Sequence, residues 1–159
     1  MKDGKLSSII FLTLRNNYMK NTIELIKLFE TPFLYATYCS HKDKYIIGYG
    51  QDINVYNGLT WTIEKCEQDL KNQVNTIHKI LKFNFEVFLN SNQISALASL
   101  IHDIEMETFL KSKIPYYIKD RNFVLVNNAF LMYNKNGRVV TSKKVARRKQ
   151  EQLLFNSVD

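Results

Sequence analysis

The feature that most constrains this fold is a helical pattern that stops near residue 30 and gives way to a β-rich segment. Apolar side chains recur at helical spacing in residues 23–29, after an Asn-x-x-Glu start signal at residues 21–24. Pro32 disfavours helical geometry at the residue before it, so the helix is expected to end at or near Glu30.

The segment from Phe33 to Val55 favours strands. It is rich in Tyr, Ile and Thr, and glycines interrupt it at positions 48 and 50. Such a composition is typical of pleated, half-buried backbone, and the polar residues 40–44 are suited to a turn. We therefore predict a small antiparallel sheet whose first turn lies near residues 40–44.

Helical patterns dominate the rest of the chain. Thr62 is expected to cap a long helix, and an Asn-x-x-Gln capping box at residues 90–93 precedes a continuous apolar stripe. Further helices are expected from Asp120 through Phe130 and from about residue 142 to 155. One helix, a small sheet and a helical remainder define an α+β fold.

The composition favours one domain with a basic surface. The chain has 159 residues, a formal net charge of +7, and no internal repeat or Pro/Gly-rich linker. Residues 135–149 carry seven Lys or Arg and no acid. Such a block attracts polyanions, but a solvated helix face is an equally valid interpretation. Nucleic acid is not the favoured partner, because aromatic residues do not alternate with the basic ones.

Neither a metal nor a cofactor is expected. Cys39 and Cys66 fit no metal-binding spacing. The three histidines, His41, His78 and His102, are too scattered for a zinc motif. Each histidine is expected to be a surface or half-buried side chain.

No membrane span or export signal is expected either. No apolar run approaches the roughly 18 residues that a spanning helix needs. Residues 7–14 are apolar and follow two lysines, but no small-residue cleavage site comes after them. The sequence thus predicts synthesis in the cytoplasm without a secretory signal.

Four blocks in order resemble one known family. They are LIKLFE (25–30), YIIGYG (45–50), WTIEKCEQDL (61–70), and NQISALASLIHDI (92–104) taken together with YNKNGRVVTSKKVARRKQEQLLF (133–155). Together they are similar to the phage-type lysozymes of glycoside hydrolase family twenty-four, the muramidases that phages use as endolysins. Each block alone is weak, but four in the same order are a strong signal.

The resemblance implies a lysozyme-like organisation. It covers roughly residues 23–155, which are expected to form a single domain. A sheet lobe of about residues 23–60 would join a helical lobe of about residues 61–155 through a long helix. Residues 1–22 are expected to be an N-terminal extension.

The resemblance places Glu30 at the position of the catalytic general acid. A carboxylate at a helix C-terminus feels the negative end of the helix dipole, which disfavours ionisation. Partial burial in a cleft raises the pKa of a carboxyl group further. We therefore expect Glu30 to have a raised pKa, as a general acid at neutral pH requires.

The second catalytic carboxylate is not retained. The family has Asp or Cys about nine residues after the acid, which corresponds to Cys39, or to Ser40 when counted back from the family Thr position. Ile46 occupies that Thr position and cannot hydrogen-bond a water molecule. Asp43 or Asp52 is a candidate substitute base, although turn aspartates more often cap their own turn.

Three residues are candidates for substrate binding. Gln51 replaces the His that usually follows the Gly-Tyr-Gly strand, and Tyr49 lies in that strand. Arg147 belongs to the C-terminal Arg-Arg pair. It is suited either to contact acidic peptide stems or to tie its helix to the cleft lobe.

Two functions remain open from the sequence. The leading hypothesis is a peptidoglycan muramidase that cleaves the β-1,4 bond between N-acetylmuramic acid and N-acetylglucosamine without a cofactor. It would act at the cell wall after holin release or virion delivery, with other virion proteins as further candidate partners. The alternative is an inactive lysozyme-fold module that binds peptidoglycan or has a structural role in a phage particle. Such a module would be expected to lose several site residues while it kept its core and helix caps.

Overall fold

The computed structural model describes residues 19–40 and 42–157. A helix over residues 19–29 is followed by β1 (Phe33–Cys39) and β2 (Lys44–Gly48). The later elements are α2 (Ile63–Phe85), α3 (Ser91–Ile104), α4 (Met106–Lys111), α5 (Ile114–Lys119), α6 (Phe123–Phe130), the 3-10 turn η1 (Leu131–Tyr133), β3 (Lys135–Asn136), β4 (Val139–Val140) and α7 (Ser142–Asn156). The predicted α+β class is confirmed.

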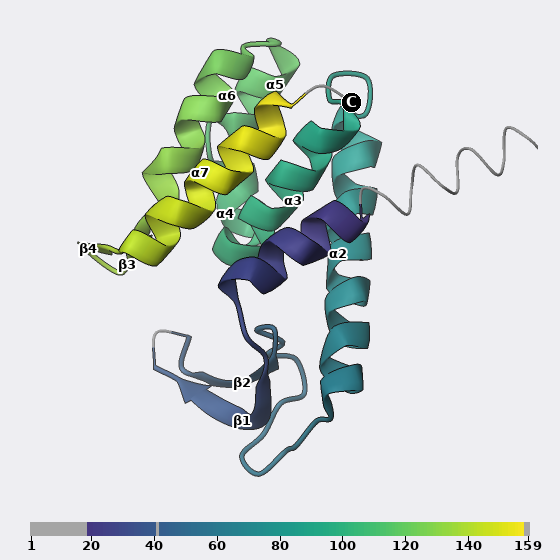
Figure 1. Ribbon diagram of the computed structural model, residues 1–159, viewed down its shortest axis with the longest axis vertical. Coiled ribbons are helices and arrows are strands. Elements are labelled where there is room, and N and C mark those ends of the chain that lie inside the picture. The colour runs from purple at the N-terminus through teal and green to yellow at the C-terminus, as the bar shows by residue number, and fades with distance from the viewer. Residues whose placement is uncertain (1–18, 41, 158–159) are drawn as a thin grey trace, which may run out of the picture.

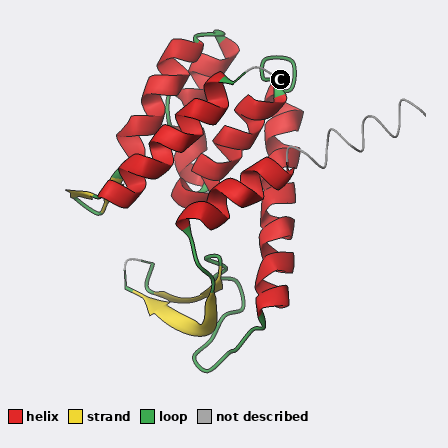
Figure 2. Ribbon diagram, in the orientation of Figure 1, coloured by secondary structure: helices red, strands yellow, loops and turns green. Residues whose placement is uncertain are grey.

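The elements form two lobes joined by one long helix. The β1–β2 sheet lies at one end of the molecule, and helices α3 to α7 gather at the other (Figure 1). Helix α2 runs along the side of both, and the helix over residues 19–29 crosses it between them. In the described part of the chain, the strands are confined to this sheet and to the small β3–β4 hairpin (Figure 2).

The first helix ends where the sequence predicts, but it does not begin there. The amide of Glu30 donates the last helical hydrogen bond to the carbonyl of Ile26 at 2.9 Å, and Pro32 follows. Residues 19 and 20 are already helical, so Asn21 lies inside the helix and is not its cap. The start predicted at Asn21 is therefore wrong, because apolar Met19 extends the packed face toward α2.

The predicted hairpin is confirmed. Cys39 pairs with Lys44 and Thr37 with Ile46 in an antiparallel register, which places the turn within residues 40–43. The strands end at Gly48, whose φ of +59° favours glycine. A Cβ at this position would lie 3.2 Å from the ring of Trp61, so only glycine fits comfortably.

After the first helix, local capping signals located two helices correctly and one incorrectly. The Thr62 side chain accepts a hydrogen bond from the amide of Lys65, and both bonds of the Asn90–Gln93 capping box are present. The helix start predicted at Asp120 is wrong. Asp120 closes α5, and the side chain of Asn122 caps α6 instead.

The buried apolar side chains form two groups. The larger one lies among the helices of the helical lobe. The smaller one joins the helix over residues 19–29 and the end of the sheet to α2, through Ile26, Tyr49, Cys66, Leu70 and Val74. This packing fixes the end of the first helix, and hence Glu30, against α2.

Within residues 19–40 and 42–157, no helix combines the length and apolar character needed to cross a membrane.

Candidate active site

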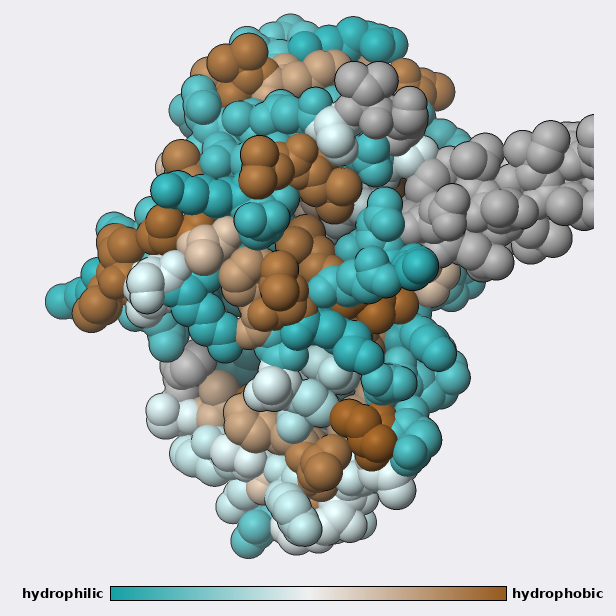
Figure 3. Space-filling model, viewed as in Figure 1, coloured by the Kyte–Doolittle hydropathy of each residue, from teal (hydrophilic) through white to brown (hydrophobic). Residues whose placement is uncertain are grey.

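A cleft of about 1310 Å³ lies between the sheet and the helical lobe. Its walls come from the end of the first helix, the β1–β2 hairpin, α3, the β3–β4 hairpin and α7. Pockets for small molecules are usually of about 300–1,000 Å³, so this cleft has room for a longer ligand. On the face shown in Figure 3, hydrophilic residues cover much of the waist between the lobes.

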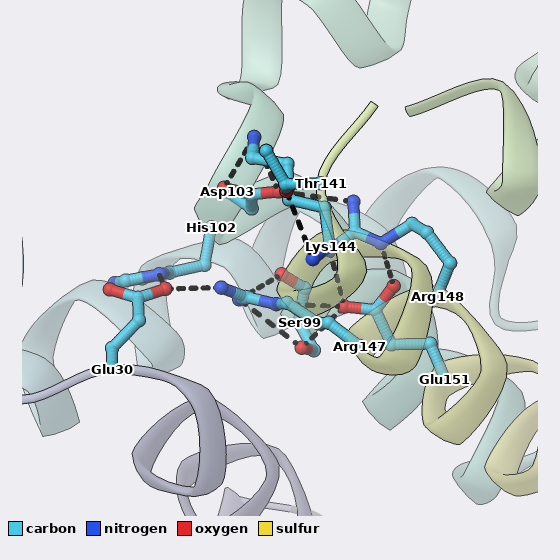
Figure 4. Close-up of polar contacts among 9 residues, drawn as sticks. All are labelled: Glu30, Ser99, His102, Asp103, Thr141, Lys144, Arg147, Arg148 and Glu151. Atoms are coloured by element: carbon cyan, nitrogen blue, oxygen red, sulfur yellow. Dashed lines mark hydrogen bonds and ion pairs between the residues drawn. The ribbon is translucent and has the colours of Figure 1, made fainter. Parts of the chain in front are cut away.

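Glu30 lies in this cleft directly after the first helix, and its side chain is 25% exposed. Its Oε1 accepts a hydrogen bond from Nη1 of Arg147, which reaches it from α7. The Nδ1 atom of His102 on α3 lies 3.4 Å from the same oxygen. Figure 4 shows both side chains pointing at the carboxylate.

The pKa of Glu30 is lowered, which contradicts the expectation from the sequence. Burial raises this pKa, but the neighbouring His102 and Arg147 lower it, and the net result is a pKa of about 2. The expectation rested on the helix dipole and on burial, and it did not include charged partners from distant parts of the chain. The arginine that binds its carboxylate is 117 residues away.

Arg147 is held inside the protein. Its side chain is 4% exposed, and its guanidinium reaches Glu30, the carboxylate of Glu151 (Nε to Oε1, 3.2 Å) and the carbonyl of Ser99 (Nη2 to O, 2.9 Å). These bonds tie α7 to α3 and to the end of the first helix. Of the two roles that the sequence suggested for Arg147, the geometry favours the tying role.

The ion pairs behind Glu30 form a balanced cluster. Arg148 pairs with Glu151 (2.8 Å) and with Asp103 (3.2 Å), and Lys144 also pairs with Asp103 (3.2 Å). The side chains of Arg148 and Glu151 are fully buried. Their mutual pairing offsets part of the cost of removing these charges from water.

Several of the predicted partners of Glu30 share its cleft. Cys39, Ile46 and Asp52 line it from the sheet side. The Asp52 side chain is 26% exposed, and its Oδ2 lies 3.6 Å from Nζ of Lys44. The fold thus brings a thiol and a second carboxylate into the same cleft as the candidate acid.

Ser40 and Asp43 do not line the cleft. Asp43 lies in the β1–β2 turn with a φ of +52° and accepts a hydrogen bond from the hydroxyl of Tyr38. An aspartate that accepts a hydrogen bond from a neighbouring strand in this way has an ordinary structural role.

Gln51 and Tyr49 also line the cleft, but both are engaged by the protein. The Gln51 amide donates to Asp69 on α2 and accepts from the backbone amides of Asp52 and Ile53. Tyr49 is only 4% exposed. Both residues therefore shape the wall that presents Asp52.

The histidines differ from the expectation of surface or half-buried side chains. His78 is 5% exposed and the His102 side chain 4%, so that expectation is wrong for both. Helix packing against distant elements buries them. His41 lies outside the described residues.

Three polar residues of the network that includes Glu30 and Arg147 were not among the predicted site residues: Ser99, His102 and Asp103. Asp103 stands where the family block has its Asn, and this substitution was a usable signal. Among the residues that the structure describes, no group of three or more His, Cys, Asp or Glu side chains is arranged to hold a metal ion.

Two lobes with a carboxylate in the open cleft between them define a lysozyme-type protein. The sequence matches the family model "Phage lysozyme" over residues 27–151, so the chain belongs to the phage lysozyme family.

Named relatives agree with this family. The chain is 32% identical over 137 residues to an endolysin of Bacillus phage PZA, which covers 85% of this chain and 53% of that protein. It is 32% identical over 104 residues to an endolysin of Salmonella phage P22, and the match covers 65% of this chain and 70% of that protein. The chain thus spans only about half the length of the Bacillus phage relatives that it matches.

Two solved structures have the same fold. The muramidase domain of SpmX from Asticaccaulis excentricus superposes with a TM-score of 0.76 at 25% identity, over 86% of this chain and 95% of that one. A point mutant of P22 lysozyme superposes with a TM-score of 0.69 at 30% identity, over 86% of this chain and 96% of that one.

Proposed function

We propose that this protein is a peptidoglycan muramidase that hydrolyses the β-1,4 bond between N-acetylmuramic acid and N-acetylglucosamine, with Glu30 as general acid. The observation that carries the proposal is the Glu30 carboxylate, partly exposed between the two lobes in a cleft large enough for several sugars. The relatives named as endolysins and the muramidase domain of similar fold support the same substrate class.

In an inverting scheme, the acid protonates the leaving oxygen while a base holds water on the other face of the sugar. We assign the base to Asp52, because it supplies a second carboxylate in the cleft, as the inverting scheme requires. Asp52 and Cys39 both line the cleft from the sheet side. Cys39 would then help to position the water.

We also propose that the protein acts at the bacterial cell wall, which it reaches by holin release or within a virion. This follows the relatives named as endolysins. Other virion proteins are candidate partners on the second route.

One observation favours a non-catalytic alternative. Ile46 places an apolar side chain in the cleft at the position where the family has a Thr. A module that binds peptidoglycan without cleaving it, or one with a structural role in a virion, would tolerate this change.

The two functions are distinguished by the release of new reducing ends from purified peptidoglycan. The wild type and Glu24→Gln, an exposed substitution on the same helix, are expected to cleave it. Glu30→Gln is expected to be about 10²-fold slower or worse, since it cannot donate a proton.

Sedimentation with insoluble peptidoglycan completes this experiment. Binding without cleavage by the wild type would establish the non-catalytic module. Cleavage by Glu30→Gln at the wild-type rate would show that the acid lies elsewhere.

A further inference from the structure

Glu105 has a backbone conformation that its residue type does not favour. It joins α3 to α4 with a φ of +72° and a ψ of 149°. Residues with a Cβ rarely adopt such angles, whereas glycine adopts them without strain. A strained residue that the surrounding structure maintains points to a function for its side chain.

The side chain of Glu105 has no local role that explains this conformation. Glu105 is the N-cap residue of α4, but its carboxylate accepts no capping hydrogen bond. Its backbone amide donates to the carbonyl of Ile101 at 2.8 Å, and its carbonyl accepts from the amide of Phe109 at 3.1 Å. A glycine could make both backbone bonds, so the carboxylate serves a contact outside α3 and α4.

That contact is with Lys42, which lies on the other wall of the cleft. Nζ of Lys42 is 2.6 Å from Oε1 of Glu105, and both residues line the cleft. Lys42 belongs to the β1–β2 turn of the sheet lobe, whereas Glu105 belongs to the helical lobe. Among the ion pairs of the described residues, this one alone joins the β1–β2 hairpin to the helical lobe.

The exposure of this pair makes it a contact that can open. The side chains of Lys42 and Glu105 are 33% and 59% exposed, so water and salt screen their attraction. An exposed pair of this kind shifts an equilibrium between two conformations by at most about fivefold. A ligand that makes several contacts in the cleft can therefore displace it.

We propose that Lys42 and Glu105 form a latch across the cleft, which is closed in the free protein and opens when a glycan strand enters. A strand that lies along the cleft has to pass between the two lobes that the pair joins. The fraction of open molecules then limits the apparent affinity for the glycan. The inference rests on the proposed function, because it takes a glycan as the ligand.

The first test uses the free protein and needs no glycan. Residual dipolar couplings, measured by NMR, report the mean orientation of the sheet lobe relative to the helical lobe. At about 0.01 M salt, Glu105→Gln is expected to change this orientation, because it removes the charge that attracts Lys42. Salt of about 1 M should move the wild type toward the same orientation, since the Debye length is then about 3 Å. Equal orientations of the two proteins at low salt would overturn the proposal.

Glu107→Gln is the matched control. Glu107 pairs with Lys111 on the same helix, and neither residue lines the cleft. The control loses the same charge as Glu105→Gln but should keep the wild-type orientation and affinity. An equally large change in Glu107→Gln would attribute the effect to net charge and would overturn the latch.

The second test is binding to insoluble peptidoglycan, measured by sedimentation in a Glu30→Gln background to slow cleavage. Addition of Glu105→Gln should lower the dissociation constant about two- to fivefold at low salt, because more molecules are then open. The two constants should converge at about 1 M salt. Equal constants at low salt would overturn the proposal.

Exchange of the two charges tests whether the residues act as a pair. Lys42→Glu and Glu105→Lys should each open the cleft, because like charges then face each other. The double variant has the wild-type net charge and should recover the closed orientation. Failure to recover would show that the two side chains do not interact across the cleft, which would overturn the latch.

Glu105→Gly separates the latch from an effect on folding. Glycine removes the backbone strain at this φ, so this variant should unfold at a urea concentration no lower than the wild type does. It should nevertheless bind peptidoglycan as tightly as Glu105→Gln. Wild-type affinity in a folded Glu105→Gly would overturn the proposal.

The outcomes separate this inference from the proposed function. Unchanged orientation and affinity in Glu105→Gln, with cleavage by the wild type intact, would overturn the latch alone. A wild type that neither binds nor cleaves peptidoglycan would overturn both, because no glycan would then enter the cleft.

Discussion

At the scale of single residues, the chemistry of Glu30 is determined by side chains distant in the sequence. Its carboxylate meets Arg147 from α7 and His102 from α3, and these two neighbours outweigh the effect of burial on its pKa. The free protein therefore keeps Glu30 ionised at neutral pH. In the proposed reaction, Glu30 would have to be protonated before it could act as the general acid.

The assignment of the base is tested by two matched aspartates. Asp52→Asn removes the carboxylate in the cleft and is expected to lower kcat about 10²-fold, with little change in KM, because it removes base catalysis and not substrate binding. Asp43→Asn changes a turn residue outside the cleft and should leave both constants near the wild-type values. Steady-state kinetics on soluble glycan fragments give kcat and KM for both variants.

A large loss of kcat in Cys39→Ala but not in Asp52→Asn would assign the water-holding role to the thiol of Cys39. Equal activity of all three variants and the wild type would contradict a base on the sheet side of the cleft.

At the scale of elements, α7 shows why the basic run of residues 135–149 has two roles. Arg147 and Arg148 face inward and are buried, whereas Lys143 and Lys149 are exposed. Helical geometry turns successive side chains by about 100°, so the charges of this run cannot all lie on one face of α7. Only the exposed part remains available to attract a polyanion.

The Asn90 capping box is expected to contribute measurably to stability. Asn90→Ala removes the acceptor for the amide of Gln93 and should lower the free energy of unfolding by about 1 kcal/mol. Asn90→Asp keeps that acceptor and should stay close to the wild type. Urea denaturation with an unchanged m-value measures both, and equal stability of Asn90→Ala and Asn90→Asp would contradict the assignment.

At the scale of the whole molecule, a buried polar contact joins the first helix to α2. The hydroxyl of Thr22 lies 2.8 Å from Nε2 of His78, and both residues are buried. Burial lowers the pKa of His78 to about 4. The folded protein thus holds this ring neutral at a pH where the unfolded chain protonates it.

Stability is therefore expected to fall with acidification. The contribution of neutral His78 is complete above pH 6.5 and is lost as the pH falls toward about 4, by up to about 3 kcal/mol. His78→Gln should show a weaker decrease in this window. The pKa of Glu30 is lowered from 4.5 to about 2, so its ionisation affects stability mostly at lower pH than that of His78.

Unfolding free energies measured between about pH 4 and 7 test this expectation, since the decrease should be steeper in the wild type than in His78→Gln. Parallel curves for the two proteins would mean that His78 does not control the acid sensitivity.

The sequence by itself determined what depends on neighbouring residues. The end of the first helix before Pro32, the β1–β2 turn and the caps at Thr62 and Asn90 all follow from local hydrogen bonding and backbone sterics. The false start at Asp120 shows the limit of such signals, because an Asn two residues later provided a competing cap.

Only the tertiary structure decided the state of the candidate acid and the members of its cleft. The lowered pKa of Glu30, the burial of Arg147 and the presence of Asp52 but not Asp43 in the cleft arise from contacts between segments far apart in the chain. Electrostatic interactions depend on distance and burial, and the spacing of residues along a sequence contains neither.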